Sequence, residues 1–437
     1  MLTKILQSCL FFLMGLQMAY AVPEIQHWQT KNGARVFFVP AMDLPMADVR
    51  IVFDGGSARD KHKAGLAVLS NALLSEGAAG LSAQQLAENF ENVGAEFSNG
   101  ALKDMAWLSL RSLTDDEYLK PALNNLKIIL NQPDFSRKSF ERVIAQMKTS
   151  LESSKQSPSA VAKKAYYAAL YGDHPYASPS SGTEKSLALI KRKDVRAFYQ
   201  HYYVANNAVV SIVGKLTRLQ AENIAENLLA DLPSGKKAAA IAAVKPLQKS
   251  KTIRINFPSR QTHILMGQPG TKRLDKDYFT LYVANHPFGG SGFASRLVDE
   301  VREKRGLAYS VYSYFSPMRE AGPFTLGLQT KNNQVEQSLS IIKKELKKYV
   351  DNGPTEKELD KSLKNITGGF ALRVDSNRKL AEYLSMIGFY GLPLNYLNTF
   401  VDNMKAVDLV SIRDALKRRI HPDKMITVIV GGEAAKK

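Results

Sequence analysis

Short hydrophobic runs alternate with longer stretches of helical periodicity along most of the chain. The runs at 35–39 (RVFFV) and 48–53 (DVRIVF) are rich in β-branched and aromatic residues, and this composition is typical of strands. Long amphipathic stretches, typical of helices packed on one face, follow such runs. The pattern predicts a mixed fold of the α+β class.

One segment near the middle of the chain lacks this periodicity. Residues 232–250 (LPSGKKAAAIAAVKPLQKS) combine proline, glycine, small residues and lysines without core spacing, which is typical of a linker between domains. A length of 437 residues also exceeds what a single hydrophobic core normally spans. We therefore expect an N-terminal domain at 22–231 and a C-terminal domain at 251–437.

The two predicted domains repeat the same order of elements. Each opens with two strands, passes into a helix, and later contains a glycine turn that leads into a strand, in a register that places Phe97 opposite Tyr309. Each domain then continues with helices and is expected to end on a hydrophobic strand. Duplication of one α/β unit is the simplest explanation, and chance similarity of two α+β domains is the alternative. The matched segments are 36–53 and 253–267, 94–110 and 306–328, and 209–214 and 426–431.

Residues 1–21 have the pattern of a secretory signal peptide. Lys4 supplies a positive charge, residues 9–16 form an apolar stretch, and AYA at 19–21 provides the small residues of a cleavage site. A membrane anchor is the alternative, but the run is interrupted by polar residues and is shorter than the roughly 20 apolar residues that span a bilayer. We expect cleavage before Val22, export to the bacterial periplasm, and no stable membrane anchor.

Composition excludes several classes of protein. The chain is 45% hydrophobic and 23% charged, which excludes collagen-like, low-complexity and disordered proteins. The single cysteine, Cys9, lies in the predicted leader, so the mature chain has no disulfide, no thiolate metal site and no cysteine nucleophile. An exported chain without cysteines suits a bacterial periplasm.

The chain is strongly basic, with a formal net charge of +18. Such a balance is typical of proteins that bind nucleic acid, but export argues against that partner. The charges are dispersed along helical faces such as 343–348 (KKELKK), and we interpret most of them as a solvated surface. Anionic envelope lipids and acidic peptides remain as alternative partners for this charge.

Four motifs give the chain a resemblance to a known family. They are GLA at 65–67, YGDHPY at 171–176 with GT at 182–183, GGSGFASRL at 289–297, and REKRGLAYS at 302–310. With the duplicated architecture, they resemble the pitrilysin and insulinase type of zinc metallopeptidase, in its bacterial and mitochondrial processing-peptidase branch. The resemblance covers essentially the whole mature chain. It implies an α+β fold of two homologous α/β-sandwich halves that form a clamshell, as in mitochondrial processing peptidase.

The zinc motif of that family is missing from the matching segment. Active members carry H-x-x-E-H on the first helix of the N-terminal half, where histidines at i and i+4 ligate zinc and the glutamate acts as general base. Here Val68 and Ala72 stand at the histidine positions and Asn71 at the position of the base. Neither apolar side chain can ligate a metal, and an amide cannot accept the proton of water. We therefore expect this chain to bind no metal and no cofactor.

Other residues do not replace the motif. The family's third ligand is a glutamate on a later helix, and the corresponding residues 142–151 hold no carboxylate. No two histidines are three to five residues apart, although a site assembled from distant histidines stays open. His174 lies in a His-Pro turn, where we expect it to cap or bond locally. The histidines are His27, His62, His174, His201, His263, His286 and His421.

The resemblance implies that a catalytic pair is retained in the second half. In the family an arginine and a tyrosine seven residues apart reach the zinc site of the opposing half, and Arg302 and Tyr309 have this separation. A guanidinium and a phenol can donate hydrogen bonds to the oxyanion that develops during amide hydrolysis. From the residues alone, we would interpret Arg302 as one of several surface charges and Tyr309 as a side chain packed in a strand.

Gly289, Gly290 and Gly292 form a turn that resembles, in shorter form, the glycine-rich loop of the non-zinc subunit of mitochondrial processing peptidase. Phosphate binding is a poor interpretation, because the Walker lysine and a Rossmann context are both absent. Two interpretations stay open, namely an ordinary turn at the start of a helix and a mobile backbone that guides substrate into a cavity.

The zinc motif is lost from the first half, while the arginine and tyrosine pair is retained in the second. Together these two features predict an enzyme whose catalytic residues are divided between two chains. We expect the zinc-free subunit of a periplasmic heterodimeric metallopeptidase that degrades or processes peptides, with Arg302 and Tyr309 facing the zinc of a homologous H-x-x-E-H partner. Peptide substrates would bind as an added strand on a sheet edge. The alternative is a noncatalytic peptide-binding or scaffold pseudopeptidase, which the complete loss of ligands favours. No nucleic-acid partner is expected in either case.

Overall fold

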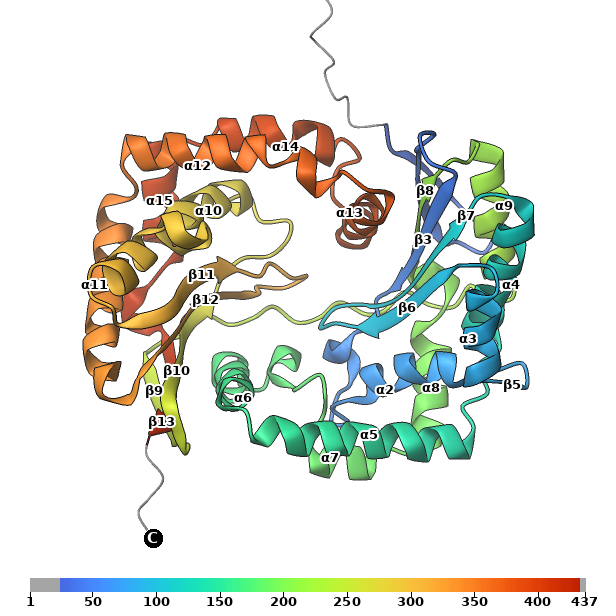
Figure 1. Cartoon of the computed structure of the whole chain (residues 1–437), viewed down its shortest axis with the longest axis horizontal. Coiled ribbons are helices and arrows are strands. Elements are labelled where there is room, and N and C mark those ends of the chain that lie inside the picture. The colour runs from blue at the N-terminus through green and yellow to red at the C-terminus, as the bar shows by residue number, and fades with distance from the viewer. Residues whose placement is uncertain (1–23, 433–437) are drawn as a thin grey trace, which may run out of the picture.

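The computed structural model describes residues 24–432 and consists of two α/β halves that lie side by side (Figure 1). Each half is built around one mixed β-sheet with helices packed on it. The predicted signal peptide at 1–21 lies outside the described residues. No helix within residues 24–432 is long and apolar enough to cross a membrane.

The N-terminal sheet has six strands in the order β1-β2-β8-β3-β7-β6. Strands β2 and β8 are parallel, and the other neighbouring pairs are antiparallel. The strand β8 is buried at all seven positions, because helices cover both faces of the sheet at its centre. The bounds are β1 (Gln26–Gln29), β2 (Arg35–Pro40), β3 (Met46–Phe53), β6 (Glu96–Ala101), β7 (Ala106–Leu113) and β8 (Ala208–Gly214), with a small separate pair β4 (Gly77–Ala78) and β5 (Leu81–Ser82).

The C-terminal sheet repeats this arrangement with five strands in the order β11-β12-β10-β13-β9. Its one parallel pair, β13 with β9, corresponds to β8 with β2, and the edge strand β11 corresponds to β6. The same order and the same directions confirm the predicted α+β fold of two homologous halves. The bounds are β9 (Lys251–Asn256), β10 (Ser259–Pro269), β11 (Ala308–Phe315), β12 (Pro323–Lys331) and β13 (Ile426–Gly432).

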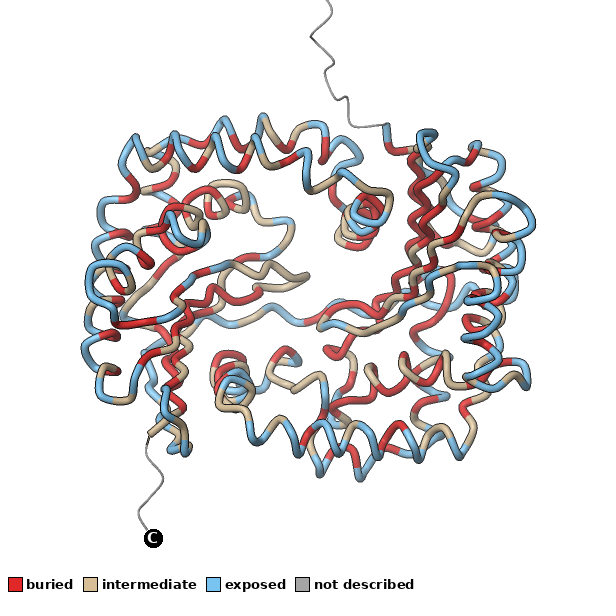
Figure 2. The backbone as a smooth tube through the Cα atoms, in the orientation of Figure 1, coloured by how far each residue is buried: buried red, intermediate tan, exposed pale blue. Residues whose placement is uncertain are grey.

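Helices follow the strands in both halves and surround the two sheets (Figure 1). Their buried faces line the cores and their outer faces are exposed (Figure 2). In the first half they are α2 (Leu66–Ala72), α3 (Ala83–Glu91), α4 (Asp116–Asn131), α5 (Arg137–Lys155), α6 (Pro158–Tyr171), α7 (Glu184–Leu189), α8 (Arg192–Tyr202) and α9 (Arg218–Leu229). In the second half they are α10 (Tyr278–Asn285), α11 (Val335–Asn352), α12 (Glu356–Gly368), α13 (Asn377–Tyr390), α14 (Tyr396–Lys405) and α15 (Leu409–Arg419).

The two halves exchange one helix each. Helix α6 of the first half packs on β10 and β13 of the second sheet, and α13 of the second half packs on β2, β3 and β8 of the first. The buried Tyr166 of α6 donates a hydrogen bond of 3.2 Å to the carbonyl of Phe324. On α13, Gly388 lies so close to Phe37 and Val209 that a Cβ atom would clash with both. Each half therefore completes the core of the other.

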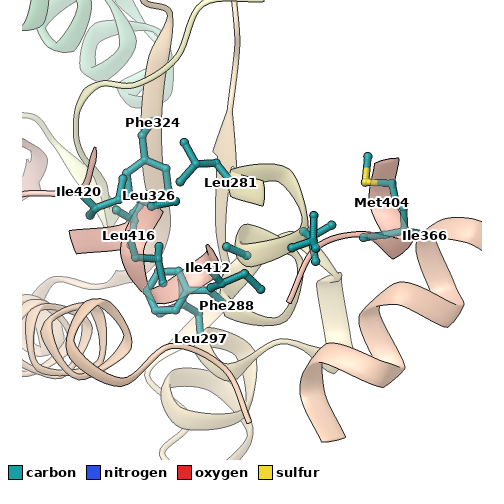
Figure 3. Close-up of a cluster of buried hydrophobic side chains, with 14 of the residues drawn as sticks. Leu281, Phe288, Leu297, Phe324, Leu326, Ile366, Met404, Ile412, Leu416 and Ile420 are labelled. Atoms are coloured by element: carbon teal, nitrogen blue, oxygen red, sulfur yellow. The ribbon is translucent and has the colours of Figure 1, made fainter. Parts of the chain in front are cut away.

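The hydrophobic core of the second half is formed where its sheet and its helices meet. Figure 3 shows Leu281, Phe288, Leu297, Phe324 and other buried side chains converging from the sheet and from the helices around it. The cluster of buried residues to which they belong extends to Val39 and Val209 of the first half. Burial of apolar surface across the boundary stabilises the two halves as one unit.

One expectation about the end of the first half is wrong. We predicted that it ends on the strand at 209–214, but helix α9 follows and packs on α4. Its small and branched apolar residues recur at helical spacing and are buried, namely Ala221, Ile224, Ala225, Leu228 and Leu229.

The segment after α9 has no regular secondary structure up to residue 250. It crosses between the halves (Figure 1) and is held by a hydrogen bond of 2.7 Å from Arg59 Nη1 to the carbonyl of Ala239. Ile241 within it is buried. The segment is therefore anchored to the surface that it crosses.

Candidate functional site

Helix α2 carries the positions at which the zinc motif is missing. It begins after Gly65, whose φ of +96° is a left-handed conformation that favours glycine. The buried Asp60 accepts hydrogen bonds of 2.8 Å from the backbone N–H groups of Gly65 and Ala67, and so satisfies donors that the helix leaves free at its start. Burial raises the pKa of Asp60 to about 7. The helix is thus fixed in place although it holds no zinc ligand.

Asn71, at the position of the general base, is fixed by structural hydrogen bonds. Its side chain is 1% exposed, and Nδ2 donates to Tyr203 Oη at 3.2 Å and to the carbonyl of Trp107 at 3.3 Å. The backbone carbonyl of Asn71 accepts a hydrogen bond of 2.7 Å from Asn99 Nδ2 on the edge strand β6. The amide therefore joins α2 to its neighbours.

A zinc ion does not fit these residues. Val68 and Ala72 offer no lone pair, and the Asn71 amide donates both of its hydrogen bonds to oxygen atoms of the protein. Arg142 of α5 forms an ion pair with Glu76, which lies in the short helical turn that follows α2. Within residues 24–432, no group of three or more His, Cys, Asp or Glu side chains could hold a metal ion.

His174 forms local hydrogen bonds, as its position in a His-Pro turn predicts. Its Nδ1 accepts a hydrogen bond of 3.1 Å from the backbone N–H of Tyr176, which caps a short helical turn. Its Nε2 lies 2.8 Å from the carbonyl of Ala242 in the crossing segment. The local role expected for this histidine is confirmed.

Replacing Asn71 by alanine is expected to lower the free energy of unfolding by about 1–3 kcal/mol, because two buried acceptors lose their donor. Urea unfolding followed by circular dichroism measures the difference. Asn352→Ala, at the exposed C-terminal end of α11, is the matched control and should change stability far less. Equal stability of Asn71→Ala and the wild type would contradict a structural role for the amide.

Arg302 and Tyr309 lie together on the surface of the second half. Arg302 belongs to a π-helical turn, Val298–Glu303, and Tyr309 is the second residue of the edge strand β11. The pairing of β11 with β12 shifts register between Ala308 and Ser310, so Tyr309 is the extra residue of a β-bulge. Its side chain is 79% exposed. The structure therefore places the predicted pair side by side on an open face.

A third residue completes this surface, and the sequence did not indicate it. The Arg302 guanidinium carbon lies 5.7 Å from the ring centre of Tyr309 and 5.0 Å from that of Phe293, which is itself 79% exposed. Both distances are within the range of a cation–π interaction. The carboxylate paired with Arg302 is that of the adjacent Glu303, at 3.5 Å. Phe293 directly follows the last glycine of the glycine-rich motif, which was the available signal.

The glycine-rich segment packs against β11. Gly289 is buried, and a Cβ there would lie 2.3 Å from Ser313 Oγ, so only glycine allows this close approach. Gly290 lies against Asn285, while Gly292 adopts a φ of +61° at an exposed position with open space around it. The turn therefore joins the end of α10 to Phe293. A role for these glycines in guiding substrate stays a prediction.

Family models match both halves of the chain. One, described as "Insulinase (Peptidase family M16)", matches residues 41–184, and another, "Peptidase M16 inactive domain", matches residues 190–366. The second model covers the segment that holds Arg302 and Tyr309.

Individual proteins are similar over almost their full length. A non-peptidase homolog, YmxG, of Helicobacter pylori is 29% identical over 96% of this chain and 97% of its own. An uncharacterized zinc protease, also named YmxG, of Bacillus subtilis is 24% identical over 93% of this chain and 98% of its own. A crystal structure described as a peptidase M16 inactive domain from Pseudomonas fluorescens is 40% identical, with a TM-score of 0.91 over 94% of this chain and 99% of that one.

Proposed function

This chain belongs to the M16 (insulinase) family of peptidases, and from that premise we propose that it is the zinc-free subunit of a heterodimeric M16 peptidase. It is a pseudopeptidase of the family, with an inactive M16-type domain. In the proposed complex a homologous subunit with an intact H-x-x-E-H motif holds the zinc. This chain supplies Arg302 and Tyr309.

The exposed pair of Arg302 and Tyr309 is the observation that carries the proposal. Tyr309 is the extra residue of a bulge on an edge strand, and bulges of this kind re-aim side chains at functional sites. Its phenol is largely exposed beside the guanidinium of Arg302, and no hydrogen bond holds its hydroxyl within residues 24–432. A surface that presents two strong donors suits an oxyanion formed outside this chain.

Each member of the pair has a separate role in this proposal. The Arg302 guanidinium provides a fixed positive charge, and the Tyr309 phenol provides a neutral donor. Both would stabilise negative charge that develops on the carbonyl oxygen of the scissile amide. Phe293 and Tyr309 lie on the guanidinium and limit its movement.

Peptides or unfolded polypeptides are the proposed substrates. Strand β11 is the outer strand of its sheet. Its outer edge is covered at Ser313, whose carbonyl accepts a hydrogen bond of 2.9 Å from Asn285 Nδ2 and against which Gly289 packs, so unpaired main-chain groups can be offered only by the rest of the edge. An extended peptide can pair with such an edge through main-chain hydrogen bonds that depend little on its sequence. The predicted leader, together with a mature chain without cysteines, supports a periplasmic location.

Native mass spectrometry of the tagged chain, purified from its own envelope extract, tests this proposal. We expect a complex of two subunits of similar mass that contains one zinc ion. A metal-free monomer or homodimer would contradict the divided enzyme.

A noncatalytic peptide-binding protein is the second candidate, and the fixed Asn71 amide favours it. Such a protein would bind peptides on the same edge strand without any partner and without turnover. Detection of a zinc-bearing partner in the mass spectrum would exclude this candidate.

A further inference from the structure

A cavity of about 590 Å³ lies between the two halves, away from the positions of the lost zinc motif. The turn between β6 and β7 and Tyr167 of α6 line it from the first half. The loop that precedes α10, the turn between β11 and β12, and Tyr390 of α13 line it from the second. Cavities of this volume at a boundary between domains are typical of small-ligand sites.

A second cavity of about 550 Å³ adjoins the first. The two share Arg273, Tyr278 and Met386, so they form one groove that we call the boundary groove. Arg373 and Tyr383 line its outer part. Most of the side chains that line the boundary groove are aromatic or apolar, and six are charged, namely Lys103, Asp104, Arg273, Arg373, Lys379 and Glu382.

Arg273 is the central charge of the boundary groove. Its Nη1 donates to Tyr278 Oη at 3.3 Å, and its Nε is buried without any hydrogen-bond partner. The guanidinium lies 5.6 Å from the Tyr278 ring and 5.5 Å from the Tyr390 ring. No carboxylate forms an ion pair with Arg273 in the described part of the chain. A half-buried guanidinium of this kind lacks the anion that normally compensates it.

Arg373, in the outer part of the groove, is a second half-buried arginine that lies beside tyrosine rings. It lies 5.6 Å from the ring of Tyr282, and hydrogen bonds with Tyr282 and Tyr383 raise its pKa against the effect of burial. Burial also raises the pKa of Tyr383, so its phenol stays protonated near neutral pH. Among residues 24–432, Arg373 also has no ion pair with a carboxylate.

Three of the other four charged groups that line the groove have partners. Asp104 accepts hydrogen bonds from Tyr176 Oη at 2.6 Å, from Tyr390 Oη at 3.0 Å and from the backbone N–H of Arg319 at 2.7 Å. Lys103 donates to the carbonyl of Ser178. Lys379 pairs with Asp375 at 2.8 Å, whereas Glu382 lines the groove without an ion pair among residues 24–432. Apart from the paired Lys379, three cations (Lys103, Arg273 and Arg373) and two carboxylates (Asp104 and Glu382) line the groove, so its net charge is positive by one.

We propose that the boundary groove binds the terminal carboxylate of a peptide whose last side chain is aromatic or apolar. Planar guanidinium groups match the two oxygens of a carboxylate, and phenols can add neutral donors. The aromatic and methionine side chains around them would contact the body of the last residue. The peptide origin of the carboxylate rests on the proposed function, whereas the preference for an apolar anion rests on the groove alone.

The edge strand β11 connects this groove to the exposed pair. Its first residues hold Tyr309, and Phe315 at its other end lines the cavity. A strand of this length extends about 25 Å at roughly 3.3 Å per residue. Asn285 and Gly289 cover the edge of β11 at Ser313, so a peptide that ends in the groove would not pair with the whole strand.

Fluorescence anisotropy on the purified full chain, without any partner, tests the inference. The probes are an N-terminally labelled five-residue peptide ending in phenylalanine with a free carboxylate, and the same peptide with a C-terminal amide. We expect the amide to bind at least about 10-fold more weakly, because it lacks the charge that the guanidinium groups recognise. Arg273→Met should weaken binding of the free acid about 10- to 100-fold.

Matched variants and competitors make each outcome decisive. Arg137→Met removes an arginine that is 84% exposed on α5 and should leave binding unchanged. Arg373→Met is a second variant, which keeps the test valid if Arg273→Met does not fold. Equal affinity of the chain for the free-acid peptide and for the amide peptide would overturn the inference. It would also be overturned if inorganic phosphate displaced the labelled peptide as well as the same concentration of unlabelled free-acid peptide does. Because no partner is present, this result is independent of whether the heterodimer exists.

Discussion

Replacing Tyr309 by phenylalanine is expected to lower the turnover of the assembled heterodimeric peptidase by about 10²- to 10³-fold. This is the usual cost of removing one preorganised donor from an oxyanion site. The ring, its contact with Arg302 and the backbone bulge all remain in the variant, so assembly and stability should not change. The measurement is the initial rate of peptide cleavage by the purified heterodimer, compared at saturating and at low substrate concentration.

Two comparisons separate a catalytic role of Tyr309 from a structural one. Tyr118→Phe, on the outer helix α4 of the other half, removes a phenol far from the proposed site and should leave the rate unchanged. Arg302→Lys keeps the charge but loses the planar fork, and it should also lower the rate without dissociating the subunits. Full activity of Tyr309→Phe in an intact heterodimer would remove the catalytic assignment.

The repeated architecture could be predicted from the sequence because each strand is a local pattern. The alternation in β7, where Ala106, Leu108 and Leu110 are buried, is visible in the residues themselves. The glycine motif and the spacing of Arg302 and Tyr309 are equally local. These features do not depend on how distant segments meet.

The exchange of helices could not be predicted in this way. Helix α6 has apolar residues on one face, and that pattern does not reveal that β10 and β13 of the other half cover it. Asn71 is another example, because its partner Tyr203 lies 132 residues away along the chain. Periodicity shows which face is buried, and tertiary packing decides what buries it.

The boundary groove was missed for the same reason. Arg273 follows a lysine in the charged segment 271–277 (TKRLDKD), and a segment with this many charges is normally interpreted as solvated surface. Only the fold places it beside Tyr278 and Tyr390, which come from a helix start and from the exchanged helix α13. The chemistry of the groove thus arises from the boundary between halves.

Replacing Asp104 by alanine is expected to cost about 3–5 kcal/mol of stability, the largest stability effect that we predict, because three buried donors lose their acceptor. Its carboxylate is 2% exposed and joins the turn after β6 to Tyr176 of the first half, and to Tyr390 and the Arg319 backbone of the second. Burial and the Asp104 carboxylate raise the pKa of both phenols, so they remain donors. Without Asp104, these donors stay buried with no acceptor.

Urea unfolding at neutral pH measures this cost, and the comparison of variants identifies its source. Asp116→Ala removes a carboxylate whose side chain is 74% exposed and should change stability by well under about 1 kcal/mol. Tyr390→Phe deletes one of the three hydrogen bonds and should cost about 1 kcal/mol, because the acceptor keeps its other two donors. A similar small effect for Asp104→Ala would show that the other contacts across the boundary hold the halves together without it, namely the apolar packing of the exchanged helices and hydrogen bonds such as that of 2.8 Å from Arg35 Nη1 to the carbonyl of Gly388. A large loss would show that this one carboxylate organises the boundary on which the groove depends.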